Sequence, residues 1–361
     1  MAPGEIAALR LAGQRIAGSR ARSVGEVVAA LGAMQSQDYA GALWTMGLRV
    51  PGMTETAVER AVAERHVIRT WPMRGTLHFV AAADVRWMLA LLTPRVIAGT
   101  KLRCTQLELD DAIFARCRKV FERALAGNRQ MSREALLELL EREKISTVGG
   151  RGYHIFFRIA QEGMICFGAR EGKQLTFALL DEWSPAVRSR DPDRDAALVE
   201  LAARYFTSHG PANVQDFVWW SGLKTSDARA GLEGAAPALI KETINGVACW
   251  MAPDAAPLED ARAYLLPGFD EYLLGYKERS AVLDAKYAGR IVPGSNGVFL
   301  PTLVLDGKVA GIWKRTVKKR TVALAVTPFR PLNKADKAAL NDAAERYGKY
   351  MAMPAELDVP K

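Results

Sequence analysis

Cysteine and histidine are scarce in this chain, with four of each among 361 residues. A zinc knuckle or an iron–sulfur loop needs cysteines in close pairs on one turn of the chain. The cysteines are instead spread widely, at Cys104, Cys117, Cys166 and Cys249. We therefore expect no metal and no other cofactor, and we expect buried thiols suited to a reducing compartment.

The chain also lacks a long uninterrupted apolar run. Its most apolar stretch, residues 79–99, contains Asp84, Arg86 and Pro94, which disfavours a membrane span. The first residues include Glu5 and show no basic segment followed by an apolar one, so no export signal is indicated. We expect a cytoplasmic protein without a membrane partner.

Three motifs of common hydrolases and nucleotide-binding proteins are missing: the phosphate-cradling Gly-x-x-x-x-Gly-Lys-Ser/Thr, the Gly-x-Ser-x-Gly elbow and His-Glu-x-x-His. Positive charge is present instead, because 49 Lys and Arg residues against 40 Asp and Glu residues give a net charge of +9. This excess favours a polyanionic partner, since each bound phosphate releases a condensed counterion. The position of the charge matters more than its sum.

A succession of helix, helix and β-hairpin opens the chain. The apolar residues of 24–49 recur at helical spacing, and Ser23 followed by Glu26 is a capping pattern for the start of a helix. A second helix and a hairpin with Arg74-Gly75 at its turn are predicted over residues 55–65, 67–71 and 76–80.

The same order of elements returns twice downstream. The second copy has predicted helices over 133–143 and 153–162 and a hairpin over 164–167 and 175–178. The third has predicted helices over 196–209, 214–221 and 226–232 and a hairpin over 239–243 and 247–251. Asn245-Gly246 within the last hairpin is a strong turn signal, because both residues tolerate positive φ in a type I′ turn.

Helices followed by a hairpin are the elements of a winged helix, in which one helix enters a DNA groove while the hairpin lies along the phosphates. A single such succession occurs by chance in many α+β proteins, but three are less easily explained that way. We predict an α+β fold with about three tandem winged-helix units and a small antiparallel C-terminal sheet, forming an open DNA-binding channel. The predicted segments are 1–100, 101–188, 195–254 and 255–361, with a charged linker over 185–193.

The C-terminal part is β-rich and carries the densest positive charge. Strands are predicted over 264–266, 297–305, 308–313 and 321–326, and a closing helix over 334–347. Between two of these strands stand five basic residues: Lys314, Arg315, Lys318, Lys319 and Arg320. They predict a hairpin tip that binds DNA phosphates, with Trp313 beside it as a flat face for stacking on a base or sugar. The alternative is a solvated turn whose lysines deter edge-to-edge aggregation.

Gln35 and Gln37 form a Gln-x-Gln pattern within the stretch of helical spacing over 24–49, and both can face one substrate only where the first predicted helix ends or bends. On its own, such a pair is usually two exposed glutamines or a helix-capping amide. Together with segments 71–78, 267–277 and 296–301, however, it resembles the AlkZ-like bacterial DNA glycosylases, which are winged-helix proteins. The resemblance extends over most of the chain.

This resemblance implies a monofunctional DNA glycosylase that hydrolyses the N-glycosidic bond of alkylated nucleotides in duplex DNA, namely N7-alkylpurines that are bulky or interstrand-crosslinked. It implies catalytic roles for Gln35 and Gln37. An N7-alkylated purine is already cationic and needs little acid catalysis to leave, whereas amide oxygens can orient a water and stabilise the developing positive charge on the sugar. Arg74, in segment 71–78, is assigned to DNA contact, and we expect a nucleoid-associated monomer.

Three carboxylates are candidate accessory acids or bases: Asp38, directly after Gln37, and the pair Asp270-Glu271. The pair precedes residues 272–274, predicted as a strand, where acidic residues more often cap or pair with cations. Two other functions stay open. One is a non-catalytic winged-helix regulator or architectural protein that needs neither glutamine. The other is a hydrolase centred on Asp270-Glu271 that acts on an acidic small substrate.

Overall fold

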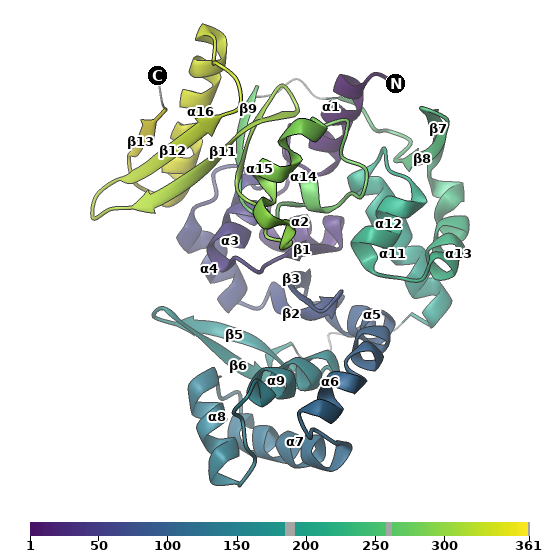
Figure 1. The fold of residues 1–361 in the computed structure, drawn as a ribbon, viewed down its shortest axis with the longest axis vertical. Helices are drawn as coiled ribbons and strands as arrows, with labels where there is room; N and C mark the ends of the chain where they lie inside the picture. The colour runs from purple at the N-terminus through teal and green to yellow at the C-terminus, as the bar shows by residue number, and fades with distance from the viewer. Residues whose placement is uncertain (185–191, 258–261, 360–361) are drawn as a thin grey trace. The chain divides into compact units, whose positions relative to one another are not determined.

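The structure is a computed structural model that describes residues 1–184, 192–257 and 262–359. Most of the predicted linker, residues 185–191, lies outside the described residues. The chain divides into two compact units, called here the larger unit (Met1–Glu59 and Leu198–Lys361) and the smaller unit (Arg60–Ala197). Both mix helices with strands (Figure 1), so the predicted α+β class is confirmed.

The larger unit begins with helices and one short strand: α1 (Pro3–Gly13), α2 (Val24–Leu31), β1 (Ala33–Gln35) and α3 (Tyr39–Leu48). Ser23 caps α2 as predicted, because its side chain accepts a hydrogen bond from the N–H of Glu26. The single helix expected over 24–49 is wrong. Gly32, with φ of +80°, ends α2 in a conformation that favours glycine. The Gln-x-Gln pattern therefore lies between a strand and a helix.

The elements of the third predicted copy are present in the larger unit, with α11 starting just before the unit boundary. They are α11 (Arg194–His209), α12 (Val214–Ser221), α13 (Thr225–Ala235), the short 3-10 helix η1 (Ala236–Ala238), β7 (Ile240–Ile244) and β8 (Val247–Met251). Asn245 and Gly246 have φ of +50° and +77°, as the predicted type I′ turn requires.

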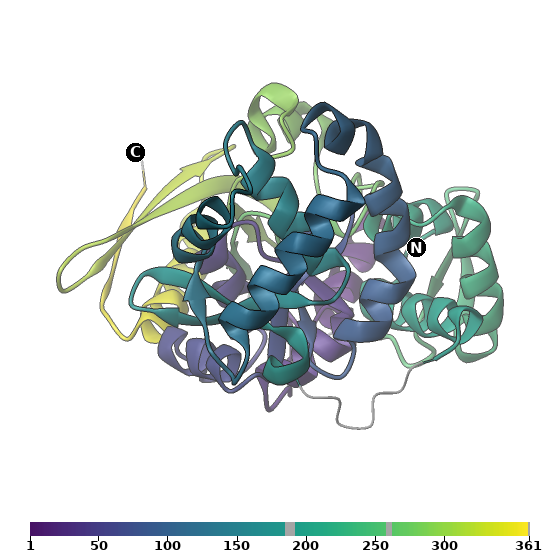
Figure 2. The same ribbon diagram turned by 90° about the horizontal axis from the view of Figure 1, so that it is seen from below.

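The C-terminal sheet of the larger unit has five strands in the order β13-β12-β11-β10-β9. They are β9 (Ala263–Leu266), β10 (Thr302–Leu305), β11 (Lys308–Val317), β12 (Val322–Pro328) and β13 (Ala355–Asp358). The predicted antiparallel pairing holds from β9 to β12, but β13, which was not predicted, pairs with β12 in parallel. The β11–β12 hairpin extends beyond the rest of this sheet (Figures 1 and 2).

Five further helices lie between the strands of this sheet in the chain: α14 (Glu271–Leu274), η2 (Ala285–Tyr287), α15 (Ala288–Ile291), η3 (Pro293–Ser295) and α16 (Lys334–Met351). The strand predicted over 272–274 is wrong, because these residues form α14 with Asp270 as its N-cap. The predicted closing helix is confirmed as α16, which packs on β9, β12 and β13. Apolar side chains of α1 and of the sheet share one core, among them Ile6, Leu11, Tyr264 and Val304.

Two hairpins form most of the sheet in the smaller unit. Its strands are β2 (Val67–Met73), β3 (Thr76–Ala81), β4 (Met131–Ser132), β5 (Ile165–Glu171) and β6 (Gln174–Leu179). They follow the order β3-β2-β5-β6-β4, with β2 and β5 paired at Arg69 and Phe167. The hairpins of the first and second predicted copies thus share a sheet, while the number of winged helices and the four predicted segments stay predictions.

The helices of the smaller unit are α5 (Val85–Gly99), α6 (Lys101–Gln106), α7 (Asp111–Leu125), α8 (Arg133–Arg142), α9 (Arg151–Gln161) and α10 (Leu180–Trp183). Helix α4 (Glu55–Ala63) crosses the unit boundary. No helix in the described part of the chain is both long and apolar enough to cross a membrane. All four cysteines are free and buried, as predicted, and burial raises the pKa of the Cys117 thiol to about 11.

Candidate active site

The Gln-x-Gln pattern occupies the turn from β1 into α3. Gln35 ends β1 and is only 7% exposed, whereas Gln37 and Asp38 are exposed. Asp38 is the N-cap of α3 with an extended backbone. Residues two apart point in different directions on a regular helix. Gln35 and Gln37 do not lie on one helix, so helical geometry does not keep their side chains from facing the same substrate.

A buried carboxylate anchors the backbone of this pattern. Oε1 of Glu271 accepts a hydrogen bond from the N–H of Gln35 at 3.1 Å, and its Oε2 accepts one from the indole N–H of Trp220 at 2.9 Å. Nε2 of His209 lies 3.6 Å from the same Oε2. Glu271 has no exposed surface. Its carboxylate therefore connects β1 with α12 and α14.

Asp270 forms a buried, two-pronged ion pair with Arg49, with both N···O distances at 2.9 Å. Thr45 donates a further hydrogen bond to Asp270 at 3.1 Å. Breaking a buried pair by removing one partner typically costs about 3–5 kcal/mol, because the other charge stays buried without compensation. The Asp270-Glu271 segment thus fixes the end of α3 through one carboxylate and the end of β1 through the other.

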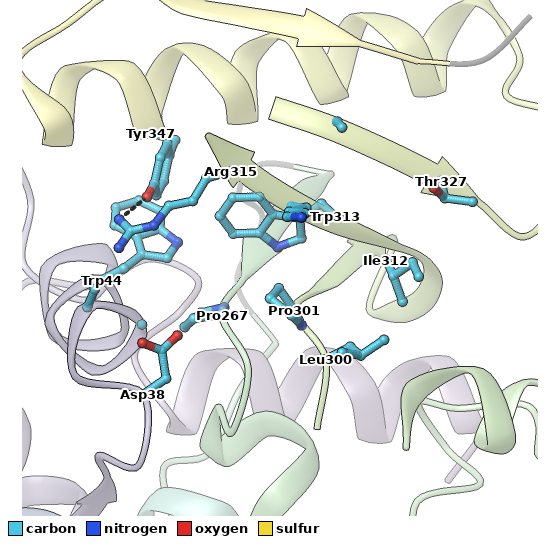
Figure 3. A pocket seen from close by; sticks show the side chains of 14 residues that line it. Asp38, Trp44, Pro267, Leu300, Pro301, Ile312, Trp313, Arg315, Thr327 and Tyr347 are labelled. Carbon is cyan, nitrogen blue, oxygen red and sulfur yellow. Dashed lines mark hydrogen bonds between the residues drawn. The ribbon is translucent and has the colours of Figure 1, made fainter. Parts of the chain in front are cut away.

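A cavity of about 650 Å³ lies next to the Gln-x-Gln pattern in the larger unit. It is lined by residues of α3, of the β11–β12 hairpin, of α16 and of the loops that follow β9 and precede β10 (Figure 3). Four sequence-predicted site residues are among them: Asp38, Trp313, Lys314 and Arg315. Other lining residues were not predicted, notably Trp44, Pro267, Pro301 and Tyr347.

Trp313 is a wall of this cavity and is only 6% exposed. Its indole N–H donates to the carbonyl of Leu266 at 2.7 Å, and its ring meets the ring of Tyr347 edge-on at 5.2 Å. The ring is therefore largely covered in the molecule without DNA, and its stacking on a base or sugar stays a prediction. The strand alternation points position 313 inward, while the exposed Lys314 follows it.

The basic residues of the β11–β12 hairpin fall into two groups. Arg315 and Lys318 have partners within the protein: Arg315 donates to the hydroxyl of Tyr347 at 2.6 Å, and Lys318 pairs with Glu356 at 2.6 Å. The other three, Lys314, Lys319 and Arg320, are exposed, as Lys318 also is. The predicted basic tip is present, although Lys314 to Val317 belong to β11 and the turn itself is residues 318–321.

The family described as "DNA glycosylase AlkZ-like" matches residues 28–350 of this chain. The chain belongs to the AlkZ-like DNA glycosylase family. Its predicted enzyme class, DNA glycosylase, and its predicted resemblance are thereby confirmed.

A curated sequence and a solved structure from Streptomyces sahachiroi resemble this AlkZ-like glycosylase. A protein named interstrand DNA cross-link repair glycosylase is 26% identical over 332 residues, which cover 85% of each chain. The solved structure of the DNA glycosylase AlkZ has a TM-score of 0.79 and 22% identity over 99% of each chain. The two structures therefore share a fold.

Arg74 of this AlkZ-like glycosylase lies in the smaller unit, apart in the chain from the other predicted site residues. It occupies the turn between β2 and β3 with φ of +54°, and its guanidinium lies 3.3 Å from Nε2 of His78. Burial, followed by the nearby Arg74 charge, holds the pKa of His78 well below its ordinary value. A neutral His78 can accept a hydrogen bond from Arg74 while donating from Nδ1 to the carbonyl of Thr76 at 2.9 Å.

Sequence reasoning missed the residues that surround the Gln-x-Gln pattern in this AlkZ-like glycosylase. Trp44 and Tyr347 line the cavity, and Trp220 shares the carboxylate of Glu271. Aromatic residues on apolar helix faces look like ordinary core residues, and their partners are more than fifty positions away. In the described part of the chain, no group of three or more His, Cys, Asp or Glu side chains is placed to hold a metal ion.

Proposed function

We propose that this chain is a monofunctional glycosylase that hydrolyses the N-glycosidic bond of N7-alkylated purines in duplex DNA. Gln35 and Gln37 are the proposed catalytic residues. The observation that carries this proposal is the Gln-x-Gln pattern at the β1–α3 turn, with its backbone anchored by the buried Glu271 in a chain of a DNA glycosylase family.

The reaction needs little general-acid catalysis and depends more on stabilisation of the developing charge by fixed dipoles. An N7-alkylated purine carries a positive charge, so when the C1′–N9 bond breaks, the base leaves as a neutral molecule with the bonding electron pair. Positive charge then develops on the sugar. Amide oxygens of Gln35 and Gln37 are fixed dipoles that stabilise this charge and orient the attacking water, which is electrostatic preorganisation.

A water molecule completes the reaction by forming the new C1′–O bond, and its proton passes to an acceptor. Asp38 follows Gln37 and is exposed, which makes its carboxylate the proposed acceptor. Asp270 and Glu271 are less suited to this role, because hydrogen bonds occupy their buried oxygens. No amine takes part, so the product is a free base and an abasic site.

Binding to DNA is proposed to use the tandem winged-helix units around an open channel, with the exposed cations of the β11–β12 hairpin contacting phosphates. Arg74 is a proposed further contact. We propose that the protein acts as a monomer in the nucleoid, because tandem units supply an extended surface without dimerisation.

The proposed lesions include bulky adducts and interstrand crosslinks. The Streptomyces sahachiroi relative is named for cross-link repair, and an open groove suits a base that a crosslink prevents from leaving the stack. Glycosylases that extrude their base into a closed pocket cannot accept such a lesion.

The decisive experiment uses duplex DNA that contains one N7-methylguanine. The purified protein is incubated with this duplex, and hot alkali then cleaves the strand at each abasic site. We expect strand cleavage by the wild type. In Gln37→Ala the excision rate should fall roughly 100-fold or more, because removing one preorganised group that stabilises transition-state charge costs about that much in rate. Gln35→Ala is expected to lose activity as well.

Gln215→Ala is the matched control, because Gln215 is an exposed glutamine on α12 of the same unit. It should cleave like the wild type. A gel-shift assay should show that all variants bind the duplex. Wild-type binding without excision of any alkyl adduct would instead support the non-catalytic winged-helix regulator, for which neither glutamine is needed.

A further inference from the structure

The cavity beside Asp38 has a shape and lining that the hydrolysis step does not use. Its volume of about 650 Å³ lies within the range of small-molecule sites, roughly 300–1,000 Å³. A methyl group on N7 needs very little of this space. The cavity opens to solvent, since exposed residues line it on opposite sides, among them Asp38, Ala325 and Thr327.

Two indole rings form fixed walls of the cavity. The indole N–H of Trp44 donates to the carbonyl of Leu265, and that of Trp313 donates to the carbonyl of Leu266, both at 2.7 Å. These carbonyls are consecutive on β9, so one strand sets both rings. With their N–H groups used in this way, the indoles offer carbon surface to a ligand.

Proline rings and apolar side chains complete the lining. In Figure 3, Pro267 and Pro301 lie below the ring of Trp313, and Leu300 and Ile312 lie to the side of Pro301. Flat rings bury large apolar areas against such surfaces and gain further from edge contacts with aromatic side chains. The chemistry of the lining therefore favours an aromatic ligand.

The polar groups stand at the edge of this lining. Asp38 provides a carboxylate, and Gly41 permits its position, because a Cβ at Gly41 would lie 2.6 Å from Oδ2 of Asp38. Arg315 is tied to Tyr347, whereas Lys314 is exposed on the hairpin. A ligand group that donates a hydrogen bond or carries a positive charge can pair with the carboxylate of Asp38. A DNA phosphate can pair with the ammonium group of Lys314.

The cavity is adjacent to the proposed catalytic residues. Asp38 lines it and is the next residue after Gln37, so the two Cα atoms are about 3.8 Å apart. A substituent on the base that faces Gln37 thus needs only a short path to enter the cavity.

We propose that this cavity binds the aromatic part of a bulky N7 adduct while the purine itself stays at the Gln-x-Gln pattern. This inference rests on the proposed function and adds the class of substrate that the site selects. The cavity would stabilise aromatic adducts over small alkyl ones without changing the chemistry of bond cleavage.

The test compares two duplexes that differ only in the adduct, N7-methylguanine and N7-benzylguanine. Both bases are cationic leaving groups, so the chemical step is matched. Ala325→Trp fills the cavity from an exposed position on β12, where no buried packing is disturbed. Ala338→Trp, at an exposed position of α16 outside the cavity lining, is the matched control.

We expect the wild type and Ala338→Trp to excise N7-benzylguanine with a higher kcat/KM than N7-methylguanine. In Ala325→Trp the benzyl preference should fall roughly 10- to 100-fold, the effect of losing the burial of one apolar ring. Excision of N7-methylguanine should be unchanged. Thr327→Trp, which fills the cavity from a second exposed position, should behave alike.

Three results overturn the proposal. An unchanged benzyl preference in both filled variants means that the adduct does not enter the cavity. An equal loss on both duplexes, with DNA binding retained in a gel shift, means that the base itself enters the cavity. A wild type that excises N7-benzylguanine no better than N7-methylguanine lacks the preference for an aromatic adduct that the proposal requires. By contrast, a wild type that excises neither adduct refutes the proposed function itself.

Discussion

The carboxylate of Glu271 receives hydrogen bonds from two groups that are far apart in the sequence. One is the backbone N–H of Gln35 and the other is the indole N–H of Trp220. A hydrogen bond to a backbone N–H holds the main chain in place, so Glu271 anchors the end of β1, two residues before Gln37. Glu271 is thus a proposed positioning residue, not a catalytic one.

Glu271→Gln should weaken this anchor, because the amide NH₂ must face one of two donors and lose that hydrogen bond. We expect a loss of about 1–3 kcal/mol in the free energy of unfolding and a slower single-turnover rate of excision, with unchanged DNA affinity. Urea unfolding, single-turnover kinetics and gel shifts measure these. Glu233→Gln, at an exposed glutamate of α13, is the control. A variant that is less stable but keeps the wild-type rate of excision would show that Glu271 contributes to stability and does not position the catalytic residues.

His78 links stability to pH in the smaller unit. It is buried beside Arg74, and its pKa is held well below the ordinary value of about 6.5 by burial and by the Arg74 charge. At a pH between the lowered and the ordinary value, the unfolded chain binds a proton that the folded chain does not. Stability is therefore fully present above about pH 6.5 and decreases as the pH falls below it.

His78→Gln should remove this contribution. Below pH 6.5, one proton taken up on unfolding changes the free energy of unfolding by up to about 1.4 kcal/mol per pH unit. Urea unfolding at pH 7.5 and at pH 5.5 gives the change for the wild type and for the variant. The variant should lose less stability between the two values, whatever its stability at pH 7.5. Equal losses would show that His78 is protonated in the folded state.

Residue identity predicted some of these arrangements better than others. The capping role of Ser23 was evident from the sequence because it depends on Glu26, three residues away. The ion pair of Asp270 was not, because Arg49 lies 221 positions away and no local pattern signals it. Trp313 was predicted to stack on a base or sugar because a basic run follows it, and the burial that the alternation of β11 gives its side chain was not foreseen.

Local signals also explain the errors at the scale of elements. Apolar spacing over 24–49 suggested one helix, but Gly32 within it was the available sign of a helix end. Asn245-Gly246 and Arg74-Gly75 were sufficient to predict their hairpins, because positive φ at both positions specifies the turn. Strand β13 escaped prediction, since a four-residue strand needs β12 beside it to form.

The β11–β12 hairpin is the element in which charge and function are most directly connected. Lys319 and Arg320 are exposed at its turn, whereas Lys318 is already paired with Glu356. A cation that contacts a DNA phosphate releases a counterion, and this makes the binding constant depend on salt. An internal ion pair reduces that release.

Lys319→Ala and Arg320→Ala should each weaken binding to any duplex. We expect the slope of the logarithm of the binding constant against the logarithm of salt concentration to fall by about 1 for each replaced cation, and by less for Lys318→Ala. Fluorescence anisotropy over a series of salt concentrations measures the slope. Lys337→Ala, an exposed lysine on α16, is the control. A slope unchanged by either turn variant would show that the hairpin does not reach the phosphates.

At the scale of the whole molecule, composition predicted a basic globular protein, the order of the predicted elements its α+β class, and the family likeness its enzyme class. The division into units was harder to foresee. Strands β2 and β5, from two predicted copies, pair in one sheet of the smaller unit, while α2 and β1 belong to the larger unit. Repeats of element order show which pieces recur, but pairing between copies depends on long-range contacts that periodicity does not contain.

The most demanding property of the whole molecule is the proposed action on interstrand crosslinks. A duplex crosslinked through two N7-alkylguanines runs as one slow band on a denaturing gel, and excision at one guanine separates the strands. We expect the wild type to convert this band into single strands, one with an abasic site, while Gln37→Ala does not and Gln215→Ala does. Borohydride should trap no protein–DNA adduct, because water rather than an amine attacks C1′. Excision of N7-methylguanine without strand separation would restrict the enzyme to single-strand lesions. A trapped adduct would show that a lysine amine, rather than water, attacks C1′.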